Sequence, residues 1–401
     1  MSATNAWIRD QLKDRRERGL LRSDQILTQS SDGWTDPTGR PFLNFASNDY
    51  LGFTRRPELR EAAARAALDF GAGAGASRLV TGTRTLHVEL EESVARLKGY
   101  PAARLFGSGM MAATGVIPAL LDAGCDVFAD RLAHACLLDG CRLSGARLRR
   151  FRHNDVEDLR TKLAAARADA RKLVVTESIF SMDGDVAPLA DIASAAAEAG
   201  ADLMVDEAHA TGVWGPHGAG VASQLGLQSR VAVSMGTFSK ALGAQGGFVC
   251  CDGEMANWLL NAARTFVFTT APAPAVAGAA LAALRLIGAD PDPGARVQAM
   301  ARGLRERLRA EGFDTGASQT QIIPVMVGGN PEAVRIASAL RDAGILAPAI
   351  RPPTVPDGTA RIRISICLDH TEADLERLFT ALIHAFDSTG EFTKAGEKAY
   401  D

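Results

Sequence analysis

The sequence predicts an α/β protein in which a large, mostly parallel sheet is joined to a smaller α+β domain. Three observations lead to this fold class. The chain has 401 residues, more than one small core needs. Between about residues 103 and 251, short apolar runs alternate with alanine-rich amphipathic stretches, a pattern typical of strand–helix units in a parallel sheet. From about Asp292 the order of the elements changes, which indicates a separate domain.

Seven strands are expected in the large domain, each a short apolar run. They cover Ala103–Phe106, Asp126–Ala129, Arg147–Phe151, Leu173–Thr176, Ala201–Asp206, Val231–Met235 and Gly247–Cys251. Helices are expected between them, among others at Met110–Leu121, Val156–Ala168 and Leu189–Ala199. A doubly wound sheet binds its ligand at the carboxyl ends of the strands. The residues that directly follow each strand are therefore the candidates for chemistry.

Three segments of the chain are expected to have different roles in the fold. Residues 1–47 form an N-terminal arm that packs on the small domain, residues 48–291 form the large domain, and residues 292–401 form the small one. The elements predicted in the small domain are a helix to about Glu311 and segments at Gln321–Val327, Glu332–Ala343, Ile345–Ile350, Ala360–Ile366 and Thr371–Phe386. Residues 387–401 have little to bury and are expected to be frayed.

The composition excludes several classes of function. The chain has 44 basic and 47 acidic residues, so no overall positive field would gather nucleic acid or anionic lipid. The first 21 residues lack the apolar stretch of a signal peptide and carry many charges from Arg9 onward, and no window elsewhere is apolar enough to span a bilayer. Neither a signal peptide nor a membrane segment is therefore expected. The six cysteines lack C-x-x-C spacing, which suits a reduced, cytoplasmic setting.

The first chemical signal is the run Gly107-Ser108-Gly109-Met110-Met111-Ala112, which follows a predicted strand and opens a predicted helix. Small residues there allow backbone N–H groups to approach a phosphate at the positive end of the helix. A plain tight turn would use the same glycines, so both interpretations stay open. A second match, residues 71–76, follows a helical stretch and is interpreted as a loop.

The second signal is Asp206-Glu207-Ala208-His209 at the end of a very apolar strand. A helicase would need the Gly-Lys pair of a phosphate-binding loop, and this dipeptide does not occur in the chain. A metal site would need more ligands at this sheet edge, where only His134 is suitably placed, so no metal is expected. Two interpretations remain: residues that cap the next turn, or an acid and an imidazole around an organic cofactor.

The third signal is Lys240, which favours the organic cofactor. Of the seven lysines, six lie at termini or on predicted polar helical faces. Lys240 instead follows a buried strand, among small and hydroxyl residues. A lysine in this setting is either an ordinary surface residue without a chemical role or a nucleophilic amine whose pKa is lowered by its surroundings.

Together these residues make up the parts of a pyridoxal phosphate site. Lys240 would form the Schiff base with the cofactor. Asp206 would keep the pyridine nitrogen protonated, because a nearby carboxylate raises the pKa of that nitrogen. His209 can reach the phenolic oxygen of the ring from the same turn as Asp206. His134 follows another strand and could stack on the ring, unless it only begins a helix.

The phosphate of this cofactor would lie at the start of the predicted helix, near Gly109 and Met110. Thr237 and Ser239 could donate hydrogen bonds to it from the other side.

From about Leu20 to Phe386 the chain resembles the α-oxoamine synthases, which are fold-type I pyridoxal phosphate transferases. These acyltransferases condense an amino acid with an acyl thioester and release CO2. The motifs that carry the resemblance are Leu43–Phe45, Ser47–Gly52, Ser77–Gly82, Phe180–Asp185, Val205–His209, Thr237–Lys240, Phe268–Thr270 and Ile350–Pro356.

The resemblance implies further roles. Ser181 would lie near the ring oxygen, and Thr269 or Thr270 would reach the phosphate of the partner subunit in a homodimer. The side chains that would face the substrates are Arg22, Asn48, Thr354 and Arg363. The Ile350–Pro356 motif favours the branch of the family that joins L-alanine to a pimeloyl group carried on coenzyme A or acyl carrier protein. Met110 departs from the family, which usually has an aromatic residue there.

Two other classes of function would use the same residues differently. A nicotinamide-dependent oxidoreductase would bind its dinucleotide at residues 107–112, with Asp130 on the ribose hydroxyl. A catalytically silent binding protein would carry no coenzyme at Lys240. Within the α-oxoamine synthases, glycine or serine and another acyl chain are the alternatives to alanine and pimeloyl.

Overall fold

The computed structural model describes residues 2–30, 33–290 and 292–389, which fold into two compact units. The small unit holds residues 1–47, 182–184 and 299–401, and the large unit holds residues 48–181 and 185–298. The boundary at which the chain passes from the large unit back to the small one lies between residues 298 and 299, inside helix α12 (Pro293–Ala310). The sequence predicted this boundary just before the helix.

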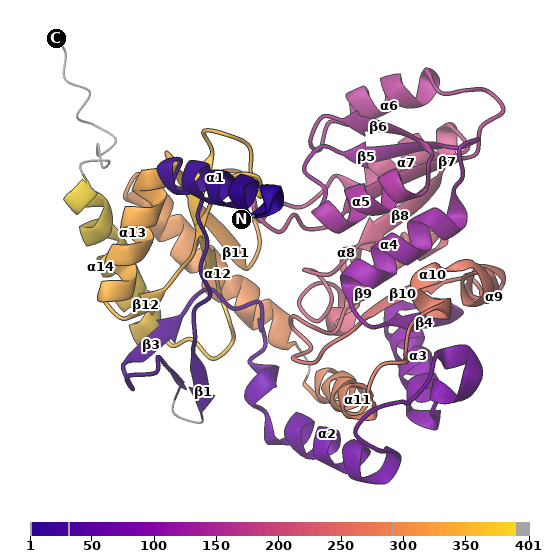
Figure 1. The fold of residues 1–401 in the computed structure, drawn as a ribbon, viewed down its shortest axis with the longest axis horizontal. Coiled ribbons are helices and arrows are strands. Elements are labelled where there is room, and N and C mark those ends of the chain that lie inside the picture. Colours follow the sequence, from indigo (N-terminus) through magenta and orange to yellow (C-terminus); the bar gives the residue numbers. More distant parts are fainter. Residues whose placement is uncertain (1, 31–32, 291, 390–401) are drawn as a thin grey trace. The chain divides into compact units, whose positions relative to one another are not determined.

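The large unit is built on the seven-stranded sheet that the sequence predicts (Figure 1). Its strand order is β4-β10-β9-β8-β7-β5-β6, and only β10 runs antiparallel to its neighbours. The strands are β4 (Ala102–Phe106), β5 (Asp126–Asp130), β6 (Arg147–Phe151), β7 (Lys172–Glu177), β8 (Asp202–Asp206), β9 (Val233–Thr237) and β10 (Gly247–Cys251). Every residue of β5, β9 and β10 is buried, as expected for strands that are covered on both faces of the sheet.

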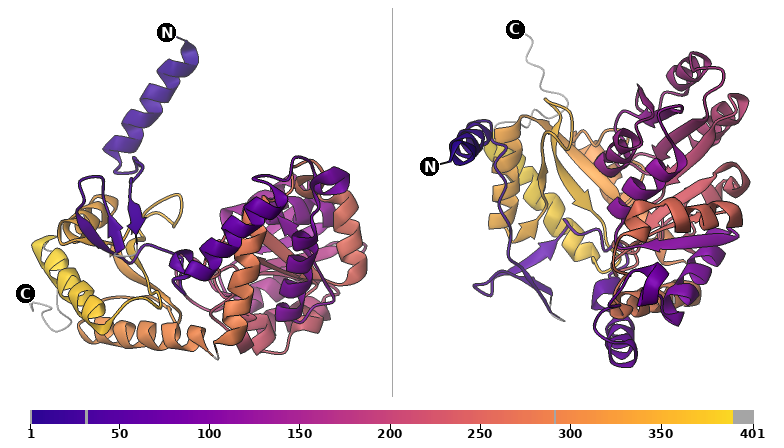
Figure 2. Two further views of the ribbon diagram at one scale, coloured as in Figure 1. Left: turned by 90° about the horizontal axis from the view of Figure 1, so that it is seen from below. Right: turned by 45° about the vertical axis from the view of Figure 1, so that its right-hand side comes forward.

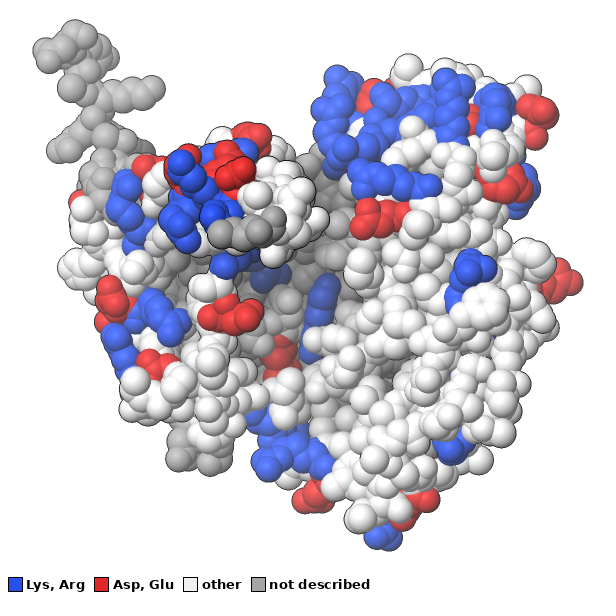
Figure 3. Space-filling view, in the orientation of Figure 1, with Lys and Arg blue, Asp and Glu red and all other residues white. Residues whose placement is uncertain are grey.

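Helices of the large unit connect these strands and lie on both sides of the sheet (Figure 2). They are α2 (Pro57–Phe70), α3 (Thr85–Lys98), α4 (Gly109–Leu120), α5 (Ala135–Leu143), α6 (Val156–Ala164), α7 (Leu189–Glu198), α8 (Val221–Gln224), α9 (Gly253–Ala262), α10 (Arg264–Val267) and α11 (Pro274–Ala289). One apolar core joins α4, α5, α9 and α10 to the sheet, and α4 contributes Val116 and Ile117 to it. On the surface of this unit, Lys and Arg side chains gather over β5 and β6 (Figure 3).

The small unit contains two sheets. One is antiparallel, in the order β11 (Ile322–Gly328), β14 (Ala360–Ser365) and β13 (Ala349–Ile350). The other joins the N-terminal strands β1 (Thr28–Ser30), β2 (Gly33–Thr35) and β3 (Pro41–Asn44) to β12 (Ile345–Leu346). The predicted single element at Ile345–Ile350 is therefore two short strands in different sheets. Pro348 lies between them and has no N–H to continue a ladder.

The helices of the small unit are α1 (Ala3–Glu17), α13 (Asn330–Asp342) and α14 (Glu372–Thr389), together with the part of α12 from residue 299. Helix α1 has no buried residue, and the arm joins the unit through the pairing of β3 with β12. Residues 387–389, predicted to be frayed, form the last turn of α14, because the helix is anchored by the buried Leu382, Ala385 and Phe386. The rest of the predicted tail, residues 390–401, lies outside the described residues.

A buried ion pair in the large unit corrects the prediction for Lys98, which was expected on a polar helical face. Its Nζ lies 2.5 Å from Oε2 of Glu207, and the two side chains are 1% and 0% exposed. The Glu207 carboxylate also accepts hydrogen bonds from the Ala222 N–H and the Ser234 hydroxyl. Gly220 has a φ of 104°, and a Cβ there would lie 2.5 Å from this carboxylate. Glu207 is therefore enclosed and held directly beside Asp206.

We expect Lys98→Met to lower the free energy of unfolding by about 3–5 kcal/mol, because it leaves the Glu207 carboxylate buried without its positive partner. The matched control is Arg285→Met, since Arg285 pairs with Glu89 while 71% and 50% of their side chains are exposed. The control should cost less than about 1 kcal/mol. Denaturant unfolding of both variants measures the difference. A smaller loss for Lys98→Met than for Arg285→Met would contradict a structural role for the buried pair.

Candidate active site

A chain of hydrogen bonds connects Lys240 to residues far away in the sequence. The Lys240 Nζ lies 2.7 Å from Nε2 of His209, and Nδ1 of the same ring lies 2.7 Å from the Tyr50 hydroxyl. The Tyr50 hydroxyl in turn donates to Oδ1 of Asn48 at 3.2 Å. A lysine ammonium can only donate, so in that state Nε2 accepts, and the proton of a neutral imidazole is on Nδ1. The whole chain then runs in one direction, from Lys240 to Asn48.

Two buried carboxyl groups lie next to each other at the carboxyl ends of neighbouring strands. Asp206 ends β8 and Glu177 ends β7, and the parallel register places them opposite one another. Asp206 Oδ1 accepts the Ala208 N–H at 2.8 Å, and Glu177 Oε1 accepts the backbone N–H of His134 at 2.7 Å. Burial raises the pKa of both carboxyl groups, and the positive charge of Lys240 opposes that shift. A cationic group placed against Asp206 would therefore be strongly favoured.

The start of α4 lies against the end of β9, as the predicted phosphate site requires. Ser108 caps the helix by accepting the Met111 N–H at 3.1 Å. A Cβ on Gly109 would lie 3.7 Å from Cβ of Thr237, so the helix start and this threonine are neighbours. The first N–H groups of a helix have no partner within it and can bind an anion.

The hydroxyl groups of this region have different roles. The Thr237 hydroxyl lies 2.6 Å from the Gly246 carbonyl and accepts the Ser239 N–H at 3.1 Å. Its single proton therefore stays within the loop, whereas the exposed Ser239 is the better donor to a ligand. Met110 is 57% exposed, so its side chain contributes little to the packing of α4.

His134 is the N-cap residue of α5. Its Nδ1 accepts the Cys136 N–H at 3.3 Å, and its backbone N–H is bound by Glu177. The histidine is thus both a helix-start residue and a residue fixed to the carboxyl edge of the sheet. The exposed ring leaves Nε2 for a ligand.

The remaining predicted residues of the large unit lie in two other places. Ser181 is buried in the loop after β7, with 8% of its surface exposed. Thr269 and Thr270 follow α10, and Thr270 forms an isolated bridge with Ser77. This bridge joins the two motifs that contain the exposed Phe268 and Val80.

Three predicted substrate residues belong to the small unit. Arg22 Nη2 donates to the Thr354 hydroxyl at 3.1 Å, so the structure brings these two together. Arg363 lies on β14, is 4% exposed and donates to the Ser365 hydroxyl at 2.8 Å. A buried guanidinium of this kind is suited to a carboxylate ligand.

Asp130, the residue that an oxidoreductase would use for ribose, has other partners. Its carboxylate accepts the N–H groups of Leu132 and Asn154 and lies 3.0 Å from Nδ1 of His153. Nε2 of His153 lies 2.8 Å from Asp185. The Asp130 carboxylate therefore links the loops that follow β5 and β6, which argues against a role in binding the ribose of a dinucleotide.

Sequence reasoning missed two residues of this site. Glu177 ends an apolar strand just as Asp206 does, so the same rule could have found it. Tyr50 lies in a motif that carried the family resemblance, but its contact with His209 joins positions 159 residues apart. No local pattern reports such a contact.

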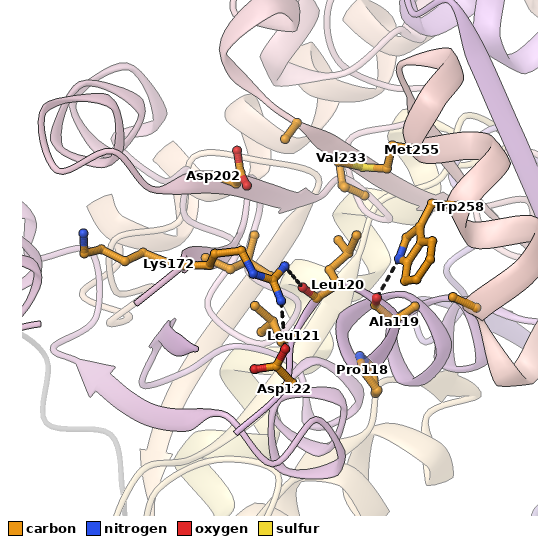
Figure 4. A pocket seen from close by; sticks show the side chains of 14 residues that line it. Pro118, Ala119, Leu120, Leu121, Asp122, Lys172, Asp202, Val233, Met255 and Trp258 are labelled. Carbon is orange, nitrogen blue, oxygen red and sulfur yellow. Dashed lines mark hydrogen bonds and ion pairs between the residues drawn. The ribbon is translucent and has the colours of Figure 1, made fainter. Parts of the chain in front are cut away.

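A cavity of about 490 Å³ lies at the amino ends of the strands, opposite the carboxyl ends where Lys240 and Asp206 lie (Figure 4). It is lined by residues at the amino ends of β7, β8 and β9, namely Lys172, Asp202 and Val233. At its wall the Trp258 indole donates to the Ala119 carbonyl at 2.7 Å. It is thus separate from the residues around Lys240.

No helix in residues 2–30, 33–290 and 292–389 is long and apolar enough to cross a membrane. Within the same described part of the chain, no three His, Cys, Asp or Glu side chains are grouped to hold a metal ion.

Residues 40–382 match the model of the family "Aminotransferase class I and II". The chain belongs to this family. It is 44% identical over 378 residues to an 8-amino-7-oxononanoate synthase of Geobacter sulfurreducens, covering 94% of this chain and 96% of that protein. The protein of the same name from Anaeromyxobacter dehalogenans is 46% identical over 376 residues, with 94% of each chain covered.

Solved structures show the same fold. A serine palmitoyltransferase from S. paucimobilis, solved with PLP and myriocin, has a TM-score of 0.91 and 31% identity, covering 98% of this chain and 100% of that chain. An 8-amino-7-oxononanoate synthase from Francisella tularensis has a TM-score of 0.76 and 25% identity, covering 88% and 99%. The predicted fold class and the resemblance to α-oxoamine synthases are confirmed.

The paired His153 makes stability depend on pH. Burial alone would lower the pKa of His153, but the hydrogen bonds to Asp130 and Asp185 raise it to about 10. The unfolded value is about 6.5, so the stabilisation is complete below pH 6.5 and is lost as the pH rises to 10. Between pH 6 and pH 10 the native chain should lose about 2–5 kcal/mol more unfolding free energy than His153→Gln. Denaturant titrations at both pH values test this, and equal losses would show that His153 is not charged in the fold.

Proposed function

We propose that this chain condenses L-alanine with a pimeloyl thioester. A bond forms between the alanine Cα and the thioester carbonyl carbon, and the carrier thiol leaves. The alanine carboxyl group leaves as CO2, which gives 8-amino-7-oxononanoate. The observation that carries the proposal is the 44–46% identity, over 94% of the chain, to proteins of that name.

The residues around Lys240 fit pyridoxal phosphate. An amine, an imidazole and a buried carboxyl group converge at one edge of the sheet, and a helix start with two neighbouring hydroxyl residues provides an anion site. The buried Asp206 gains from a cationic partner, which a protonated pyridine nitrogen supplies. When bound, this cofactor supplies an electron-accepting ring that stabilises a carbanion at the amino acid Cα.

Each side chain then has a defined task. Lys240 would hold the cofactor covalently, and its amine would act as the base that takes the Cα proton and as the acid that returns one. His209, held by Tyr50, fixes the position of the Lys240 amine through the 2.7 Å contact. Asp206 keeps the positive charge on the ring nitrogen. Ser239 and the first N–H groups of α4 bind the phosphate.

The substrate carboxylates are assigned to the arginines of the small unit. We propose that Arg363 binds a substrate carboxylate and that Arg22, positioned by Thr354, faces the acyl group. Asn48 of the large unit is also proposed to face a substrate.

A homodimer is also part of the proposal. Val80 and Phe268 are 74% and 72% exposed, and the bridge between Ser77 and Thr270 holds their segments together. Exposed apolar side chains gathered in this way mark protein contacts. In a dimer, Thr269 or Thr270 would reach the phosphate site of the other subunit.

Serine palmitoyltransferase is the second candidate, because its structures align with a TM-score of 0.91. A product assay with alanine, glycine and serine against pimeloyl-, acetyl- and palmitoyl-CoA decides between the two. We expect the highest kcat/KM for alanine with the pimeloyl thioester. Faster turnover of serine with palmitoyl-CoA would replace the proposed function.

We expect borohydride reduction to fix pyridoxal phosphate on Lys240. Peptide mapping after reduction identifies the labelled lysine, and Lys240→Ala should carry no label and form no product. The buried Lys98 serves as the internal comparison, because Glu207 holds its amine. A label on any lysine other than Lys240 would contradict the assignment.

Asp206→Asn keeps the shape of the side chain but removes its charge. Covalent binding at Lys240 needs no such charge, so borohydride labelling should be unchanged. Carbanion formation does need it, so kcat should fall by about 10²–10⁴-fold, which corresponds to several kcal/mol. Unchanged kcat would mean that Asp206 does not face the ring nitrogen.

A further inference from the structure

A strongly basic segment lies on the large unit although the chain as a whole has a formal charge of -3. Residues 131–152 contain six arginines and a single acidic residue, Asp139. The exposed members of this set, here called the basic edge, are Arg131, Arg142, Arg147, Arg150 and Arg152. Figure 3 shows Lys and Arg side chains gathered over β5 and β6, where this segment folds.

The basic edge is built from several elements. Arg147 and Arg150 lie on β6, the last strand of the sheet, and Arg142 lies in α5. Arg131 follows β5 directly, and its carbonyl oxygen accepts a hydrogen bond from the Arg150 guanidinium. The fold thus brings together arginines that are up to 21 residues apart, from Arg131 to Arg152.

Part of this charge has no carboxylate partner. Arg142 and Arg152 pair with Asp139 and Asp155, both at 2.8 Å. Arg131, Arg147 and Arg150 have no carboxylate within 4.0 Å among the residues that the structure describes. Among the described residues, no carboxylate therefore neutralises the charge of these three guanidinium groups.

The need to keep the edge strand β6 from pairing with another sheet accounts for only some of these arginines. Charged side chains on a strand such as β6 prevent pairing with another sheet. Arg131, Arg142 and Arg152 are not on the strand, and they add nothing to that protection. The combined surface instead has the character of a binding site for a polyanion.

One end of the basic edge lies near the candidate active site within the large unit, because Arg131 and Arg150 lie at the carboxyl ends of β5 and β6, whereas Arg147 begins β6 at its amino end. Arg131 lies three residues before His134, whose backbone N–H is held by Glu177 at 2.7 Å. A partner bound at Arg131 and Arg150 would therefore lie near the carboxyl ends of the strands. Strand β6 is also about 16 Å long, at about 3.3 Å per residue, which suits the surface of a protein better than one phosphate.

We propose that the basic edge docks a small acidic protein that carries the acyl group as its thioester. This inference rests on the proposed function, because it names the carrier from which the acyl group is delivered. Complementary charge would steer the carrier to the sheet edge and hold it while the acyl chain enters. A free coenzyme A thioester would not need the whole surface.

The first test measures binding without turnover. The probe is an acidic acyl carrier protein that carries phosphopantetheine but no acyl group. Its binding to the full chain is measured by fluorescence anisotropy. Arg147→Glu/Arg150→Glu should weaken binding at least 10-fold, and added salt should weaken binding to the native chain. The control is Arg230→Glu, an exposed arginine in the short helix η4 (Gln228–Arg230), which should bind as the native chain does.

The second test compares two acyl donors in the condensation with alanine. For the double variant, kcat/KM with the carrier-bound pimeloyl group should fall at least 10-fold relative to kcat/KM with pimeloyl-CoA. If the double variant does not fold, Arg147→Glu alone is expected to change the same ratio in the same direction. An unchanged ratio would overturn the proposal.

Other outcomes separate the two proposals. If the native chain turns over neither donor, the proposed function fails, while the binding test still judges the basic edge. Equal carrier binding by the native chain and the double variant would overturn the docking site. Tighter binding of the native chain to anionic vesicles or duplex DNA than to the carrier would also overturn it, because the partner would then be of another class.

Discussion

The parallel pairing of β7, β8 and β9 is the constraint on which the candidate site depends. Because these strands run in the same direction, their carboxyl ends meet at one edge, and the register sets Asp206 opposite both Glu177 and Met235. Lys240 reaches the same edge because it follows β9 by three residues. A shift of one residue in the pairing of β7 with β8 would no longer place Glu177 opposite Asp206, because successive side chains of a strand point to opposite faces.

The site concentrates charge where burial makes charge costly. Asp206, Glu177 and Glu207 are all nearly or fully buried, and each has hydrogen-bond donors around it. Lys98 neutralises Glu207 directly, while Lys240 opposes the effect of burial on the other two. The arrangement leaves Asp206 as the carboxyl group that a cationic ligand would stabilise most.

The same sheet gives the outer strands a different role. At β5 and β6, the carboxyl ends carry Asp130 and, after the strand, His153, which close loops rather than face Lys240. Beyond them the surface becomes basic. The large unit thus places a chemical centre on its inner strands and a charged surface on its edge strand, and the loop from Arg131 to His134 joins the two.

The sequence by itself determined the presence of the seven strands and the ends of four of them, at Phe106, Phe151, Asp206 and Cys251, whereas β5, β7 and β9 end one or two residues later than predicted. Apolar runs between amphipathic stretches report burial on both faces, and the position of Asp206 or Lys240 after such a run follows from the local order of residues. Only the tertiary structure decided that Lys98 is buried against Glu207, that Tyr50 holds His209 and that Ile345–Ile350 divides between two sheets. These depend on contacts between distant segments, and a local pattern of polarity carries no information about which distant side chain will supply the partner.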